Sequence, residues 1–174
     1  MDQTEINTER LLLRSFQKKD AKYVQVLAGN FNVSKTTINI PYPYKNGMAE
    51  EWIKTHKEGF DSNTEITFAI INNQNSELIG AINLIAIKEK RAEIGYWIGE
   101  PFWGRGYCTE AVKSLIDYSF TQLNLIKLVA EHLSSNPASG KVMKKSGMYH
   151  VKSIQVNDRF SKVAKAETYE IQNT

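Results

Sequence analysis

Hydrophobic and polar residues alternate along residues 92–99, with alanine, isoleucine and tyrosine on one side and glutamate, glycine and tryptophan on the other. A period of two, with β-forming residues and no internal proline, predicts a strand that ends before Pro101. From Cys108 onward the small and apolar residues recur with helical spacing, and charged residues take the opposite side. The chain is therefore expected to pass from a strand into a helix through residues 100–107.

The same periodicities predict the rest of the elements. Strands are expected at 10–16, 66–71, 77–87, 126–133, 148–156 and 160–171, and the last two should form a hairpin around residues 157–158. Helices are expected at 20–29, 48–60 and 136–147; the last begins with an Asn cap and a proline. Residues 32–44 contain two prolines and are expected to form a loop. This order predicts one α+β domain over residues 1–174, with a central, mostly antiparallel sheet flanked by helices.

Composition narrows the class of protein. The 174 residues are 41% hydrophobic and 24% charged, which is typical of a globular domain. No apolar run approaches the length of about 20 residues that spans a bilayer, and the polar start of the chain has no signal-peptide pattern. A single cysteine leaves no internal disulfide and no cysteine-based zinc site. We therefore expect a cytoplasmic protein with no membrane segment and no metal site.

The junction between the central strand and its helix is the first candidate binding site. Gly104 and Gly106 flank Arg105 and allow the backbone to turn sharply and approach a ligand closely. A helix start leaves main-chain N–H groups unpaired at the positive end of the helix dipole, where phosphates bind. A tight turn without a ligand would have the same pattern, and neither G-x-G-x-x-G nor G-x-x-x-x-G-K-[ST] occurs in the chain.

Three segments carry a resemblance to a known family. They are TERLLLR at residues 8–14, the stretch 92–111, and NPAS at 136–139 running to KSGM at 145–148. Together they resemble the RimJ/RimL type of the GNAT superfamily of N-acetyltransferases, in the family's order and spacing. Cys108, Ser146 and Met148 depart from the usual residues. The resemblance implies a GNAT-like fold, a twisted sheet whose two central strands splay apart, and acetyl-CoA as the acetyl donor.

The resemblance also implies where the cofactor binds. The pantetheine arm would enter the splayed gap beside residues 97–99, and the pyrophosphate would meet N–H groups of residues 104–109. The cofactor-binding candidates are Trp97, Ile98, Gly99, Gly104, Arg105, Gly106, Tyr107, Cys108, Thr109 and Asn136. Arg105 could equally be a solvated loop arginine. Lys141, Lys144 and Lys145 could approach the adenosine phosphate or form a solvated helix face.

Charge is unevenly distributed along the chain. The net charge is +3, yet residues 127–165 hold eight Lys and Arg against two acidic residues. A basic segment favours an anionic partner, and the phosphates of coenzyme A are sufficient. RNA would also be attracted, but no recognition helix, RRM-like motif or arginine-rich arm is present, so direct nucleic-acid binding is not expected.

Candidate catalytic residues follow from what acetyl transfer requires: a neutral amine, and a proton for the departing thiolate. Glu93 matches a strand glutamate that serves as base in some relatives, although it could instead be a surface carboxylate paired with Arg91. Many relatives place a tyrosine acid on the later helix where this chain has Met143, so Ser139 becomes the candidate donor. Ser139 could also simply accompany the Asn136 cap. Cys108 as an acyl-carrying nucleophile is a further alternative, since a helix start lowers a thiol pKa.

The acceptor is the least determined part of the site. The early loop and helix form the acceptor cleft in relatives, which points to Tyr42, Tyr44 and Trp52, although aromatic residues there could belong to the core. At pH 7 an α-amine is roughly a tenth deprotonated and a lysine amine about 0.04%. This difference corresponds to about 3 kcal/mol of barrier.

We therefore expect direct transfer, in a ternary complex, to a protein N-terminal α-amine of the ribosomal-protein type. A polyamine or amino sugar is the alternative acceptor, and the modest net charge argues against a highly cationic one. A non-catalytic acyl-CoA-binding module is the alternative of another class. The sequence leaves open a homodimer and a ribosomal partner.

Overall fold

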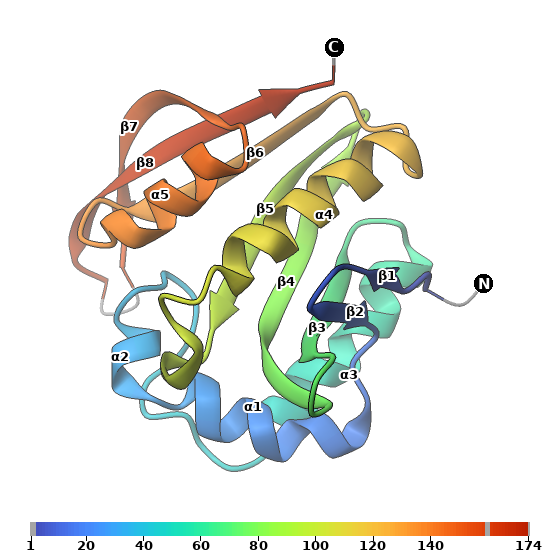
Figure 1. Ribbon diagram of the computed structural model, residues 1–174. Coiled ribbons are helices and arrows are strands. Elements are labelled where there is room, and N and C mark those ends of the chain that lie inside the picture. Colours follow the sequence, from blue (N-terminus) through green and yellow to red (C-terminus); the bar gives the residue numbers. More distant parts are fainter. Residues whose placement is uncertain (1–2, 159–160, 174) are drawn as a thin grey trace.

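The computed structural model of the protein describes residues 3–158 and 161–173 (Figure 1). The strands are β1 (Ile6–Asn7), β2 (Leu11–Arg14), β3 (Ile66–Asn72), β4 (Glu77–Lys88), β5 (Arg91–Ile98), β6 (Lys127–Leu133), β7 (Tyr149–Asn157) and β8 (Val163–Gln172). The α-helices are α1 (Ala21–Ala28), α2 (Phe31–Ser34), α3 (Met48–Asp61), α4 (Tyr107–Thr121) and α5 (Pro137–Lys145). Short 3-10 turns are η1 (Lys18–Asp20) and η2 (Glu100–Phe102).

The strands of the described ranges form one eight-stranded sheet in the order β1-β2-β3-β4-β5-β6-β8-β7. β5 and β6 are parallel neighbours, whereas the other neighbouring pairs are antiparallel. A parallel pair needs a crossover connection, and α4 supplies it. The expected α+β fold with a mostly antiparallel central sheet is confirmed.

The parallel pair separates partway along its length. β5 and β6 pair only where residues 91–94 lie beside residues 127–130, although the two strands continue to Ile98 and Leu133. Beyond that point no strand of the described residues fills the space between them. Figure 1 shows the result as two arms, one holding β6, β7, β8 and α5 and the other holding β1 to β5. The splay expected for the central strands is present.

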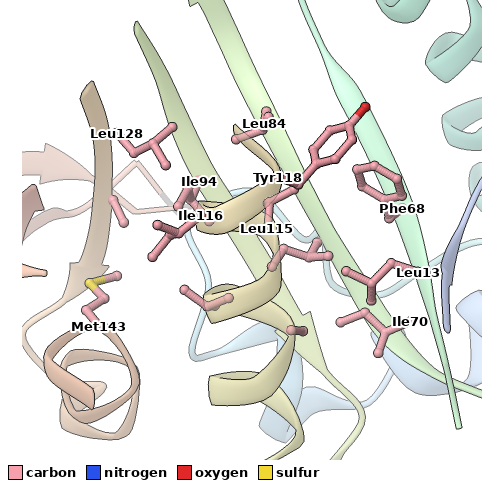
Figure 2. Close-up of a cluster of buried hydrophobic side chains, with 14 of the residues drawn as sticks. Leu13, Phe68, Ile70, Leu84, Ile94, Leu115, Ile116, Tyr118, Leu128 and Met143 are labelled. Carbon is pink, nitrogen blue, oxygen red and sulfur yellow. The ribbon is translucent and has the colours of Figure 1, made fainter. Parts of the chain in front are cut away.

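Helices cover both faces of the sheet, so the sheet has two cores. In β3, Phe68 and Ile70 face the core under α4 and α5, whereas Ala69 and Ile71 face the core under α1 and α3. All of β3 is buried, because both of its faces are covered. Figure 2 shows the first of these cores, where α4 packs on the sheet through Leu115, Ile116 and Tyr118. This packing holds the first turn of α4 in place beside the end of β5.

The structure departs from the sequence-based expectations at short elements. Within the expected loop, α2 forms one helical turn that Asn30 caps by accepting from the Asn32 N–H at 2.7 Å. Four residues are too few to show a helical period, and β1 is shorter still. The expected hairpin is present as β7 and β8, although Phe160, the expected start of its second strand, lies outside the described residues.

The helices also bear on the question of a membrane segment. In the part of the chain that the structure describes, none is both long and apolar enough to traverse a bilayer.

Leu115→Ala tests the packing that anchors α4. Leu115 has 0% exposure in the α4 core, so its truncation should cost about 3 kcal/mol in the free energy of unfolding, from lost burial plus the remaining cavity. Urea denaturation measures this change. Val26→Ala on α1, where the side chain is 73% exposed, is the control and should change stability by less than about 0.5 kcal/mol. Equal effects of the two substitutions would contradict the assigned core.

Candidate functional site

The splayed strands open onto a cleft of about 890 Å³. Its walls come from both arms of the sheet, from α3, α4 and α5, and from the loop before α3. The cleft brings together these residues singled out in the sequence: Tyr44, Trp52, Glu93, Trp97, Ile98, Gly104, Gly106, Tyr107, Cys108, Thr109, Asn136 and Ser139. Residues from widely separated parts of the chain therefore meet in one place, as a site requires.

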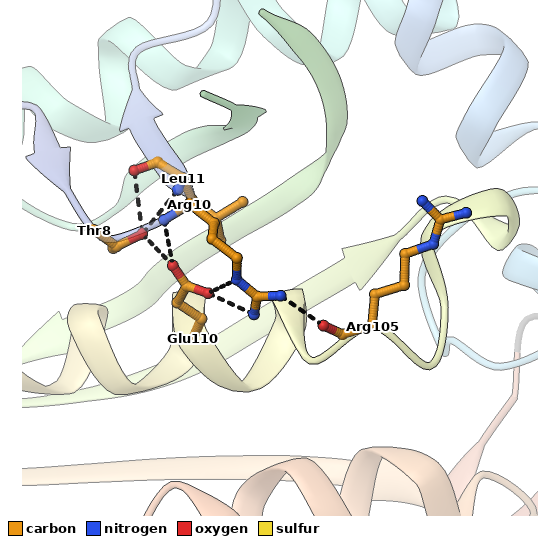
Figure 3. Close-up of polar contacts among 5 residues, drawn as sticks. All are labelled: Thr8, Arg10, Leu11, Arg105 and Glu110. Atoms are coloured by element: carbon orange, nitrogen blue, oxygen red, sulfur yellow. Dashed lines mark hydrogen bonds and ion pairs between the residues drawn. The ribbon is translucent and has the colours of Figure 1, made fainter. Parts of the chain in front are cut away.

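Three other candidates do not line this cleft. The Tyr42 ring is 45% exposed and packs edge-on against Phe31, with 5.1 Å between ring centroids. The Gly99 N–H donates to the Ile79 carbonyl oxygen at 2.9 Å, so the sheet already uses it. Arg105 is exposed, and its side chain turns away from Glu110 and Arg10 (Figure 3).

One end of the cleft is suited to an anion. Gly104 and Gly106 have φ angles of 74° and 79°, a left-handed conformation that favours glycine. Gly106 caps α4, and the first hydrogen bond of the helix runs from the Glu110 N–H to the Gly106 carbonyl oxygen at 3.1 Å. The N–H groups of residues 107–109 precede that bond and lie at the positive end of the helix dipole. Lys141 and Lys145 of α5 line the same cleft.

The splayed gap presents main-chain groups of β5. Because the Gly99 N–H bonds to β4, the pairing register turns the main chain of odd-numbered residues toward β4 and that of even-numbered residues toward β6. Ile98 therefore turns its main chain toward the gap, whereas Trp97 offers its side chain to the cleft. The Ile98 carbonyl oxygen accepts a hydrogen bond from the Trp103 indole N–H at 2.6 Å, which the sequence did not indicate.

The other end of the cleft, beside the point where β5 and β6 stop pairing, is acidic. Glu65, Glu93 and Glu131 all line the cleft, and they come from the residue before β3, from β5 and from β6. Burial, and then the nearby charge of Glu131, raise the pKa of Glu93 above the ordinary value for glutamate. Within the described ranges no ion pair joins Glu93 to Arg91. A carboxylate in this setting is a stronger base than a solvated one, and it would be stabilised by a bound cation.

On the opposite face of β5, a tyrosine that sequence reasoning missed contacts the candidate serine. The Tyr96 hydroxyl lies 2.7 Å from Ser139 Oγ and donates to the Ser139 carbonyl oxygen at 3.2 Å. Burial raises the pKa of Tyr96, so its phenol stays protonated at neutral pH. Tyr96 shares its alternating pattern with Ile94 and Ile98 and therefore resembled a core residue. The feature that could have identified Tyr96 from the sequence is its polar hydroxyl on a strand expected to lie beside the helix that begins at Pro137.

The start of α5 is compatible with both roles considered for it, a capped helix terminus and a site for the proton donor Ser139. The Asn136 side chain accepts from the Ser139 N–H at 3.4 Å and donates to the Thr36 carbonyl oxygen at 3.2 Å, so Asn136 caps the helix. Ser139 is buried beside Tyr96, and Met143, one turn further along, is 1% exposed in the core.

Cys108 lies where burial outweighs the helix dipole. Burial raises the pKa of its thiol to about 12, and the side chain packs against the core under α4. A protonated thiol is a poor nucleophile, which argues against an acyl-cysteine route.

This environment predicts slow alkylation of Cys108. Iodoacetamide at pH 8 should modify the folded protein at least about tenfold more slowly than the urea-unfolded chain, because the thiolate is the reactive form. Mass spectrometry follows the reaction without ambiguity, since the chain has a single cysteine. Equal rates in the two states would mean that the thiol is accessible and ionisable in the fold.

Comparison with known proteins identifies the family of the chain. The Acetyltransferase (GNAT) domain model matches residues 10–149. An uncharacterized N-acetyltransferase, p20 of Bacillus licheniformis, is 34% identical over 138 residues, which cover 78% of this chain and 77% of that protein. Spermidine N(1)-acetyltransferase of Vibrio cholerae is 25% identical over 88% of this chain and 90% of its own.

A solved structure of RimL, a ribosomal L7/L12 alpha-N-protein acetyltransferase in complex with coenzyme A, superimposes with a TM-score of 0.87. It covers 97% of this chain and 98% of its own at 16% identity, so this likeness shows the fold. The similar proteins include both a ribosomal-protein and a polyamine acetyltransferase and do not single out the RimJ/RimL type. With a family match over most of its length and the splayed central strands in place, the chain belongs to the GNAT family of N-acetyltransferases.

Proposed function

We propose that the cleft transfers an acetyl group from acetyl-CoA directly to a primary amine held in the same ternary complex. The observation that carries this proposal is the division of one cleft into an amide-and-lysine end and a carboxylate end. An anionic cofactor and a cationic amine would each be stabilised at its own end. The free N–H groups of residues 107–109, with Lys141 and Lys145, fit a diphosphate.

The side chains then have distinct roles. Acetyl-CoA supplies the thioester when bound, held at its diphosphate by the N–H groups of residues 104–109. Glu93 takes a proton from the ammonium group of the acceptor, directly or through one water. As the C–S bond breaks, Ser139 Oγ gives a proton to the departing sulfur and takes up the proton that the acylated nitrogen loses; the Tyr96 hydroxyl hydrogen-bonds to Ser139 and orients it. Direct transfer agrees with the protonated thiol of Cys108.

The acceptor that we propose is a protein N-terminal α-amine, as in the RimJ/RimL type. Two features support it. An α-amine demands less of its base than a lysine amine by about 3 kcal/mol. The exposed ring of Phe31, at the start of α2, packs against the Tyr42 ring in the loop that contributes Tyr44 to the cleft, and both rings could contact residues following an N-terminus.

A small amine with several positive charges is the second candidate. The modest net charge of the chain argued against it, but the local charge of the cleft is what an acceptor meets. Glu65, Glu93 and Glu131 supply three carboxylates there, with aromatic walls from Trp52 and Trp97. This lining favours a polyamine more strongly than the sequence did.

Glu93→Gln tests the base. With a high-pKa amine as acceptor, kcat/KM of the variant should be about 100-fold lower than that of the wild type. With an α-amine peptide the decrease in kcat/KM should be clearly smaller. In the wild type, kcat/KM should fall as the pH drops through the raised pKa of Glu93, because the base works only when ionised. Stopped or continuous thiol-release assays measure both effects. Glu77→Gln, at an exposed glutamate that begins β4, is the control. Full activity of Glu93→Gln with the high-pKa amine would remove Glu93 from this role.

An acceptor screen tests the function itself. The panel holds peptides with free N-termini, the same peptides with blocked N-termini and one lysine, and spermidine. We expect thiol release with free N-terminal peptides and little with blocked ones. Turnover of spermidine that falls at least about tenfold in Glu65→Gln/Glu131→Gln would support the second candidate. Tight binding of acetyl-CoA without turnover of any acceptor would indicate a non-catalytic acyl-CoA-binding module.

A further inference from the structure

The N-terminal TERLLLR segment reaches the first turn of α4, about a hundred residues away in sequence. Glu110 Oε1 accepts hydrogen bonds from Thr8 Oγ1 at 2.6 Å and from the Arg10 main-chain N–H at 2.8 Å. Glu110 Oε2 accepts from Arg10 Nε at 2.7 Å and forms an ion pair with Arg10 Nη2 at 2.6 Å. Figure 3 shows both oxygens of this carboxylate held between the two N-terminal side chains.

Arg10 also holds the glycine turn itself. Its Nη1 donates to the Arg105 carbonyl oxygen at 2.9 Å, and its guanidinium lies 4.7 Å from the centroid of the Tyr107 ring. A Cβ atom placed on Gly106 would lie 3.4 Å from Arg10 Nη2. One side chain therefore contacts Arg105 in the turn and Tyr107 at the start of α4, and it lies close beside Gly106 between them.

The bond to the Arg105 carbonyl determines where the next N–H points. In a trans peptide the C=O and N–H groups point in opposite directions. Because the Arg105 oxygen faces Arg10, the N–H of Gly106 faces away from it. A turn with glycines on both sides of Arg105 would otherwise sample many conformations, since glycine permits both signs of φ.

The bonds to Glu110 remove a second obstacle to anion binding. A carboxylate in the first turn of a helix would repel a phosphate, and it could cap the free N–H groups in its place. Partial burial raises the pKa of Glu110, but the hydrogen bonds from Thr8 and Arg10 outweigh that effect and lower it. Glu110 is therefore ionised at neutral pH, with its charge neutralised by Arg10 and directed toward the N-terminal segment.

We propose that Arg10 is a positioning residue for the diphosphate-binding turn: it holds the Arg105 carbonyl and Glu110 so that the N–H groups of residues 104–109 remain ordered and free. This inference rests on the proposed binding of coenzyme A at that turn. Arg10 acts through the backbone, and its own nitrogens are bonded to Glu110 and to the Arg105 carbonyl. Pre-ordering lowers the conformational cost of binding and so raises affinity for the ligand.

Binding of coenzyme A, measured by calorimetry, tests the proposal independently of turnover. Arg10→Ala should weaken the Kd at least about tenfold, because charge-assisted hydrogen bonds to the turn are lost. Hydrogen exchange at the Glu110 N–H, which bonds to the Gly106 carbonyl oxygen, should become faster in the ligand-free variant because the turn is no longer held. The KM for acetyl-CoA should rise more than kcat falls. Thermal unfolding records whether the variant is folded.

A matched pair of milder variants separates positioning from general stability. Arg10→Lys keeps one ion pair but cannot reach Glu110 and the Arg105 carbonyl together, so it should weaken binding. Arg14→Lys alters the same TERLLLR segment, where Arg14 pairs with Asp20 at 2.7 Å away from the turn, and should leave the Kd unchanged.

These measurements separate the proposed binding of coenzyme A from the proposed role of Arg10. Absence of coenzyme A binding in the wild type would overturn the proposed function. If the wild type binds coenzyme A and a folded Arg10→Ala variant binds it equally tightly, only the role of Arg10 is overturned. Weakened binding without faster exchange at the Glu110 N–H would mean that Arg10 contacts the ligand directly, which also contradicts positioning.

Discussion

The parting of β5 and β6 is the constraint on which the rest of the structure depends. These strands pair over four residues and then separate, which leaves main-chain groups of β5 without a strand partner. A sheet tolerates such a gap only if something else covers it, because unpaired main-chain groups are costly when they are buried away from water. α4 and α5 cover one face of the sheet and α1 and α3 the other, and the space left between them is the cleft.

The distribution of charge in that cleft depends on which helix termini and which acidic residues line it. α4 and α5 both begin there, so helix N-termini and the lysines of α5 give one end a positive potential. Glu93 of β5, Glu131 of β6 and Glu65, which precedes β3, give the other end its negative charge. The net charge of +3 indicates neither the positive nor the negative end of the cleft. It is therefore weak evidence against a polycationic acceptor. A substrate responds to the local potential and not to the sum over the chain.

Much of the fold could be predicted because its elements are long and regular. The alternation along residues 92–99 and the helical spacing after Cys108 each show more than one period, and Asn136 with Pro137 marked the start of α5. The short β1 and α2 show no period and were missed. Tyr96 was not predicted as a site residue for a related reason. A partly buried tyrosine on the apolar face of a strand cannot be distinguished from a core residue until its neighbour Ser139 across the gap is known. The position of Tyr42 in the loop made it an acceptor candidate; only the structure shows that its ring packs on Phe31 outside the cleft, and its contact with an acceptor stays a prediction.

The sequence by itself determined the local conformations: which residues extend, which coil, and where glycine allows the chain to turn before α4. These depend on neighbours a few positions apart, so they can be read along the chain. Only the tertiary structure decided that Arg10 meets Glu110, that Tyr96 meets Ser139, and that three glutamates share one end of a cleft. The residues that meet in this way are about 30 to 100 positions apart, and their proximity depends on strand order, on register and on the point where two strands stop pairing.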